Sequence, residues 1–255
     1  MTARFSDLLA SEWIKIRSLR STPWTLALVT VLVVACSATA TLSNPQHTFL
    51  LGDAFSTAGG MTLILAAGSI GAITTVSEYS SGLIRTTTVA VPARASLVLA
   101  KAVVVTALWT VLGAIMAGGS FAVSEAVLSR WHAAVPITHP GVFRAFLAST
   151  LLAPVCALVG LGLGVLIRHS ATTMVTSTFA LLMLPVLFTP SRRWTTDVNH
   201  AMVLSAWRRL VEAWGPPNAV GPEHYPTLTG ALVVYVTWPL VAVALAVIAV
   251  RRRDV

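Results

Sequence analysis

The chain has 255 residues, of which 56% are hydrophobic and 10% are charged. Soluble domains contain about 45–50% apolar and about 25% charged residues, so this composition excludes an ordinary soluble domain and indicates an integral membrane protein. The formal net charge is +8, but basic residues that flank membrane spans set their orientation, so we expect no binding to nucleic acid.

The N-terminal segment, residues 5–19, predicts an amphipathic helix that lies in the membrane interface, because its apolar side chains form one stripe at helical spacing. Glu12 lies on that apolar stripe. Either its carboxylate reaches water or pairs with Lys15 three residues on, or it contacts a partner protein. A cleavable signal peptide is a weaker alternative, since the apolar stretch continues to Leu42 and is long enough to span.

Six segments of 23 residues or more contain no Lys, Arg, Asp or Glu. Each exceeds the roughly 20 residues that cross a bilayer as a helix. They predict membrane spans at residues 23–43, 57–77, 102–124, 145–167, 171–189 and 227–250. The spans leave no room for a folded soluble domain, so residues 1–255 are predicted to form a single transmembrane domain.

Basic residues are distributed unequally between the two sides. If the N-terminus is cytoplasmic, the inner segments hold eleven Lys and Arg residues and the outer segments hold six. This excess predicts that both termini face the cytoplasm. The eleven inner residues are Arg4, Lys15, Arg17, Arg20, Arg85, Arg94, Lys101, Arg168, Arg251, Arg252 and Arg253.

Small residues and prolines predict how the spans pack. Span two is rich in glycine, alanine and serine, and span four contains Gly160 and Gly164. Small residues let helices approach closely in a membrane, so both spans are expected to pack closely against another helix. Pro154, Pro185 and Pro239 lie within spans and predict kinks.

Two connections are more than simple turns. Residues 79–96, on the predicted inner side, are more than twice the about 2–8 residues that join antiparallel helices, so we expect a cytoplasmic helix on which a partner docks. Residues 201–214, on the predicted outer side, carry enough apolar surface to lie on the membrane or to re-enter it.

Sequence signals for enzymatic chemistry are lacking. The chain has no phosphate-binding loop, no His-Glu-x-x-His pair and no Gly-x-Ser-x-Gly turn. We therefore predict no catalytic residue, metal site or bound cofactor. Every acid and base lies at the edge of a predicted span or in a loop, which disfavours a transporter driven by a relay of buried carboxylates.

Four stretches carry a resemblance to a known family: residues 11–18, residues 78–94, the pair Ala100-Lys101 and residues 251–254. In their order and their placement against six spans they resemble the permease subunits of ABC transporters of the ABC-2 type. The likeness extends over the whole chain.

The resemblance implies an all-α integral membrane protein with an N-terminal interfacial helix, a cytoplasmic coupling helix between spans two and three, and a re-entrant element before span six. It implies an exporter in the cell membrane, in which two permease subunits, identical or different, pair and recruit two cytoplasmic ATPase subunits. Those partners, and not this chain, would bind ATP and magnesium. The apolar bundle favours lipids, drugs or lipophilic peptides over sugars as cargo.

By the same resemblance, five residues are the candidates for coupling to the ATPase: Glu78, Gly82, Arg85, Pro92 and Arg94. Glu78 would order the start of the coupling helix or pair with a basic group, Gly82 would permit a close approach, and Pro92 would end the helix. The two arginines would donate to acidic or carbonyl groups, unless they serve as ordinary positive-inside residues.

Glu12, Lys15 and Arg17 would brace the interfacial helix against the ATPase. Two other classes of function remain alternatives. A non-transporting membrane anchor or immunity protein would tolerate disruption of residues 78–94, and an intramembrane enzyme would place catalytic polar groups face to face within the spans.

Overall fold

The computed structural model describes residues 5–18, 21–46, 48–80, 94–188, 193–211 and 226–252, and every structural statement below concerns these residues. They form helices joined by short turns, and no strand occurs among them.

Six stretches are long and apolar enough to cross a membrane, which confirms the predicted number of spans. The first is α2 (Ser21–Leu42), and the second combines the short α3 (Leu51–Ala54) with α4 (Thr57–Ser80). The third and fourth are α6 (Arg94–Leu128), extended by the 3-10 turn η1 (Ser129–Trp131), and α7 (Val142–Ile167). The fifth runs from α8 (Ser170–Thr178) through η2 (Phe179–Met183) to α9 (Leu184–Leu187), and the sixth is α12 (Leu228–Arg252).

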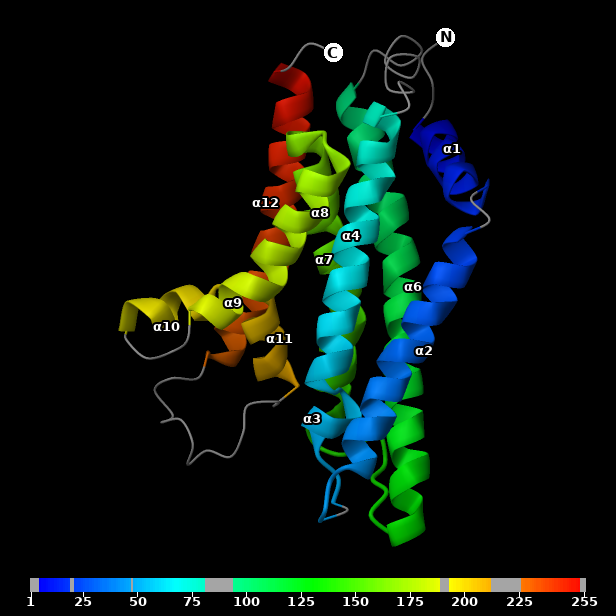
Figure 1. Ribbon diagram of the computed structural model, residues 1–255, viewed down its shortest axis with the longest axis vertical. Coiled ribbons are helices and arrows are strands. Elements are labelled where there is room, and N and C mark those ends of the chain that lie inside the picture. The colour runs from blue at the N-terminus through cyan, green and yellow to red at the C-terminus, as the bar shows by residue number, and fades with distance from the viewer. Residues whose placement is uncertain are drawn as a thin grey trace.

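Helix α7 occupies the centre of the bundle. It packs against α4, α6 and α12, and α2 lies on the outside against α6 and α4 (Figure 1). The buried core contains side chains from all of these helices, whereas many large apolar residues of α2 and α12 are exposed. Exposed apolar faces of this kind are expected where helices contact lipid.

Glycines allow α7 and α4 to lie in backbone contact. A Cβ atom added to Gly160 of α7 would overlap the carbonyl oxygen of Gly68 in α4, and one added to Gly71 of α4 would overlap the carbonyl of Ala157 in α7. The interface therefore has no space for a side chain at either position. The close packing predicted for spans two and four is confirmed.

Buried hydrogen bonds tie further helices together. Tyr235 of α12 donates its hydroxyl to the carbonyl of Ala148 in α7 at 3.1 Å, and the hydroxyls of Thr41 in α2 and Ser124 in α6 lie 2.9 Å apart. In an apolar surrounding an unpaired polar group costs free energy, so each bond holds its pair of helices in register.

The fifth span is irregular where a kink was predicted at Pro185. The π-helical turn η2 ends two residues before this proline, which has no amide hydrogen to donate. The side-chain Nδ2 of Asn199 donates to the carbonyls of Pro185 and Phe188 at 2.8 and 2.9 Å. Carbonyls that the helix end leaves without partners are thereby satisfied.

The predicted element at residues 201–214 contains α11 (Val203–Leu210), which follows the short α10 (Arg193–His200). Helix α11 is buried against α12 and α7 instead of lying free on a surface, and Trp207 at its centre is 1% exposed (Figure 1). A Cβ atom at Gly60 of α4 would overlap the indole ring of Trp207, so that glycine makes room for the tryptophan. Trp214 lies outside the described residues.

The segment predicted as an N-terminal interfacial helix forms α1 (Phe5–Ser18), which lies beside α6 at the same end of the bundle as the last turn of α12 (Figure 1). Its location at a membrane interface stays a prediction. Its buried face lies on the predicted apolar stripe, which includes Glu12. Leu8 and Glu12 are buried, whereas Phe5 and Trp13 are about half exposed. The face of α1 that packs on the bundle therefore contains a charged side chain, Glu12, as well as the apolar Leu8.

Substitution of Gly160 should destabilise the bundle. Gly160→Leu is expected to lower the free energy of unfolding by about 1–3 kcal/mol, because the side chain must force α7 away from α4. Gly118→Leu on α6 is the control, since a Cβ there meets just one neighbouring atom, of Phe146, at 3.8 Å. Thermal unfolding in detergent measures both, and equal melting temperatures for the two variants would contradict the tight α4–α7 contact.

Candidate functional site

Four charged side chains meet at the end of the bundle where α1 lies. Glu12 and Lys15 come from α1, Glu78 from the last turn of α4, and Lys101 from α6. The chain has two lysines, and both belong to this group. We refer to Glu12, Lys15, Glu78 and Lys101 as the ion cluster.

The ion cluster is connected by four short ion pairs. Lys15 Nζ lies 2.6 Å from Glu12 Oε1 and 2.7 Å from Glu78 Oε1. Lys101 Nζ lies 2.7 Å from Glu12 Oε2 and 2.9 Å from Glu78 Oε1, and it also donates to the carbonyl of Thr74 at 3.1 Å. Each lysine therefore bridges both glutamates, and the two positive charges balance the two negative ones.

Three members of the ion cluster are largely removed from solvent. The side chains of Glu12, Lys101 and Glu78 are 4%, 10% and 14% exposed, whereas that of Lys15 is 39% exposed. Charges are buried at a high desolvation cost unless partners compensate them. Loss of one partner leaves an uncompensated charge, so the ion cluster holds α1, α4 and α6 together as a unit.

The pKa of Lys15 is raised above its ordinary value of 10.5. Partial burial by itself lowers this pKa, but hydrogen bonds and charge attraction from Glu12 and Glu78 together outweigh it. The positive charge of Lys15 is thus favoured in the folded protein, as expected for a lysine between two carboxylates.

The structure shows the ion pairs of Glu12 within the chain, and a contact of Glu12 with a partner protein stays a prediction. Glu12 does pair with Lys15, as one explanation held, but it also pairs with Lys101 on another helix. Arg17, predicted beside these residues, is exposed on α1 and belongs to no ion pair among the described residues.

The two ends of the predicted coupling segment belong to helices that the structure describes. Glu78 lies in the ion cluster, and Arg94 is the first residue of α6. Gly82, Arg85 and Pro92 lie outside the described residues, as does most of the predicted coupling helix at residues 79–96. Their predicted roles stay predictions.

Lys101 is the cluster residue that sequence reasoning did not select as a site residue. The third span was predicted to begin at residue 102, but α6 begins at Arg94, so Lys101 lies within the helix and not at its edge. The sequence prediction took this charge as the end of a span, whereas the helix itself continues beyond it. With 35 residues, α6 is about 52 Å long, so it exceeds the hydrocarbon thickness and can carry a lysine near one end.

Arg168 adds a second cationic group, at the turn between α7 and α8. Its guanidinium lies over the ring of Tyr79, 4.9 Å from the ring centroid. Tyr79 is the residue that follows Glu78 of the ion cluster. Its Nε and Nη2 atoms are buried and have no hydrogen-bond partner in the part of the chain that the structure describes. The cation–π contact provides part of the stabilisation that hydrogen bonds would otherwise supply.

No group of three or more potential metal ligands occurs among the described residues. Comparison with known proteins adds no assignment: no protein-family model matches the chain, and no curated protein matches it. Membership of the ABC-2 family therefore stays a prediction from the sequence.

Single and double substitutions can test the mutual dependence of the cluster charges. Glu12→Gln and Lys101→Met should each cost about 3–5 kcal/mol of unfolding free energy, because each leaves a buried charge without compensation. The double variant should cost less than the sum of the two, since the unpaired charges are removed together. Lys15→Met should cost less than either single variant, because Lys15 itself is 39% exposed and its charge is partly solvated.

Denaturation in lipid–detergent mixtures measures these free energies. Glu125→Gln is the matched control, because Glu125 is near the other end of α6 and accepts a hydrogen bond from the amide of Val135. Strictly additive losses in the double variant would show that Glu12 and Lys101 do not depend on one another.

The raised pKa of Lys15 predicts a loss of stability in alkali. Its contribution is fully present below its ordinary pKa of 10.5 and disappears as the pH rises through the higher value of the folded state. The native chain should therefore lose more stability above pH 10.5 than Lys15→Met, which has no proton to lose. Melting temperatures measured along a pH series provide the comparison, and parallel curves would exclude this contribution.

Proposed function

We propose that this chain is the membrane-spanning permease subunit of an ATP-driven exporter of the ABC-2 type, and that ATP is hydrolysed on separate cytoplasmic subunits. The observation that carries the proposal is the ion cluster, which joins the two ends of the predicted coupling segment to each other and to the N-terminal helix. The family resemblance of the sequence supplies the identity of the partner.

The position of the ion cluster suits the transmission of force. Glu78 lies shortly before residues 81–93 and Lys101 lies shortly after them, and these two side chains are 2.9 Å apart. A partner that moved the intervening segment would displace α4 and α6 together, because separating them exposes buried charges. Glu12 and Lys15 would carry the same displacement to α1.

Charge on the same end of the bundle suits an acidic partner. Both carboxylates of the ion cluster are neutralised internally. The residues from Tyr79 to Ala100 contain two arginines and no acid, and Arg168 has buried guanidinium nitrogens without partners among the described residues. Complementary charge steers association and sets its register, so the docking surface of the ATPase should present carboxylates here.

Co-purification tests the proposal directly. The tagged chain, extracted from its native membrane in mild detergent, should retain an ATPase subunit that carries a phosphate-binding loop. Sealed vesicles that contain the complex should move a lipophilic substrate in an ATP-dependent manner. Consistent failure to recover any ATPase subunit with the intact chain would overturn the proposal.

A charge reversal in the predicted contact locates the docking site. Arg85→Glu should reduce recovery of the ATPase by about tenfold or more, because the introduced carboxylate repels an acidic partner. Arg130→Glu is the control, since Arg130 belongs to η1 at the other end of α6. A non-transporting anchor would retain its activity in both variants, which separates that alternative from the exporter.

A further inference from the structure

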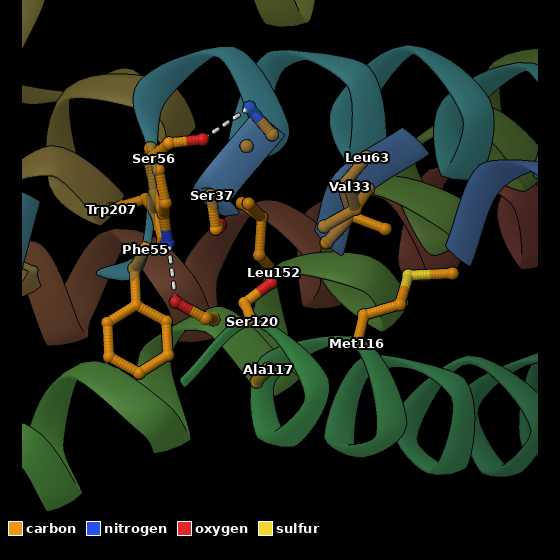
Figure 2. Close-up of a pocket in the computed structure, with 13 residues that line it drawn as sticks. Val33, Ser37, Phe55, Ser56, Leu63, Met116, Ala117, Ser120, Leu152 and Trp207 are labelled. Carbon is orange, nitrogen blue, oxygen red and sulfur yellow. Dashed lines mark hydrogen bonds between the residues drawn. The ribbon is translucent and has the colours of Figure 1, made fainter. Parts of the chain in front are cut away.

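A polar pocket lies inside the bundle, at a distance from the ion cluster. Helix α2, the beginning of α4, helix α6 and helix α7 form its walls, and Trp207 of α11 reaches in from one side (Figure 2). Four serines are among its lining residues: Ser37, Ser56, Ser120 and Ser149. All four are buried, so the pocket brings hydroxyl groups together in a region otherwise walled by apolar side chains.

Two of these hydroxyls already accept hydrogen bonds from the protein. Ser149 Oγ accepts from the indole nitrogen of Trp207 at 3.2 Å, and Ser56 Oγ accepts from the amide of Gly59 at 3.1 Å, as the dashed lines in Figure 2 show. A serine that accepts through its oxygen still carries a proton that it can donate. Ser149 and Ser56 therefore each retain a donor for a further partner.

Ser120 is the exceptional group of the pocket. It is 2% exposed, and its hydroxyl is buried without a hydrogen-bond partner among the described residues. In the view of Figure 2 the hydroxyl lies next to the side chain of Leu152. A buried hydroxyl with no partner costs about 1–3 kcal/mol, whereas one water molecule can satisfy several such groups.

The volume of the pocket is large enough for a water molecule. The volume open to the centre of a water molecule is about 20 Å³, compared with the roughly 10–15 Å³ that one water needs. We propose that the pocket is a water-binding site, in which one or two ordered waters accept from and donate to Ser120 and bridge it to the other serines.

Trp207 closes this site from the side of α11. Its indole ring fits against Gly60, where a Cβ atom would overlap it, and its nitrogen is bonded to Ser149. The same tryptophan therefore completes the pocket wall and orients one of the hydroxyls that face the water. The bound water in turn links α6, which carries Ser120, to α7, which carries Ser149.

Radiolytic hydroxyl-radical labelling of the full chain in lipid nanodiscs tests the proposal, because radicals form at bound water and react with the nearest side chains. Met116 and Trp207 both line the pocket, and both are 1% exposed. Trp109 is the matched control, since it is also 1% exposed but does not line the pocket. We expect Met116 and Trp207 to be modified at least about five times faster than Trp109.

Equal labelling of Met116, Trp207 and Trp109 would show that the pocket is dry and would overturn the proposal. This comparison uses the unaltered chain, so it tests whether the pocket holds water even where a variant does not fold.

Two serine variants then test the role of Ser120. Ser120→Ala should bring the labelling of Met116 close to that of Trp109, because the water loses its principal partner. Ser124→Ala, one turn along α6, should leave it unchanged, since the Ser124 hydroxyl pairs with Thr41 outside the pocket. Fast labelling of Met116 that persists in Ser120→Ala would show that Ser120 does not hold the water.

Discussion

The backbone contact between α7 and α4 sets the spacing on which the rest of the bundle depends. Lipid tails remove most of the hydrophobic advantage of bringing two helices together, so association relies on close van der Waals packing and on polar contacts. Gly160 and Gly71 allow that packing because neither interposes a side chain. With α4 held against α7, Gly60 of α4 comes to lie beside Trp207 of α11, and Trp207 reaches Ser149 of α7. One close contact thus leads to the position of α11 and to the walls of the polar pocket.

The two ends of the bundle solve the problem of buried polarity in different ways. At the end that carries α1, full charges are buried in a balanced set, in which each lysine is shared by two glutamates. In the pocket the polar groups are neutral hydroxyls, and a small neutral ligand suffices to satisfy them. Charged groups are far more expensive to leave unpaired than hydroxyls. The ion cluster is therefore suited to hold helices together firmly, and the pocket is suited to a small neutral ligand.

These two features have separate places in the proposed exporter. The ion cluster joins three helices next to the predicted docking segment, where it would convey the movement of a partner into the membrane. The water site lies within one chain, between α6 and α7, and depends on no partner. A loss of ATPase binding would therefore leave the pocket intact, and a dry pocket would leave the coupling proposal unaffected.

The number of helices long and apolar enough to span a membrane followed from the sequence, because a helix in hydrocarbon must satisfy its backbone polar groups internally and must be apolar for about 20 residues. The amphipathic N-terminal helix and the small-residue packing of spans two and four followed for similarly local reasons. Tertiary structure alone decided that Glu12, Glu78 and Lys101 form one cluster, because the ion pairs join residues 23 to 89 positions apart. It also decided that α6 continues past Lys101 and that Trp207 meets Gly60. Local patterns report which residues prefer water or lipid, whereas the partner of a buried charge depends on which helices become neighbours.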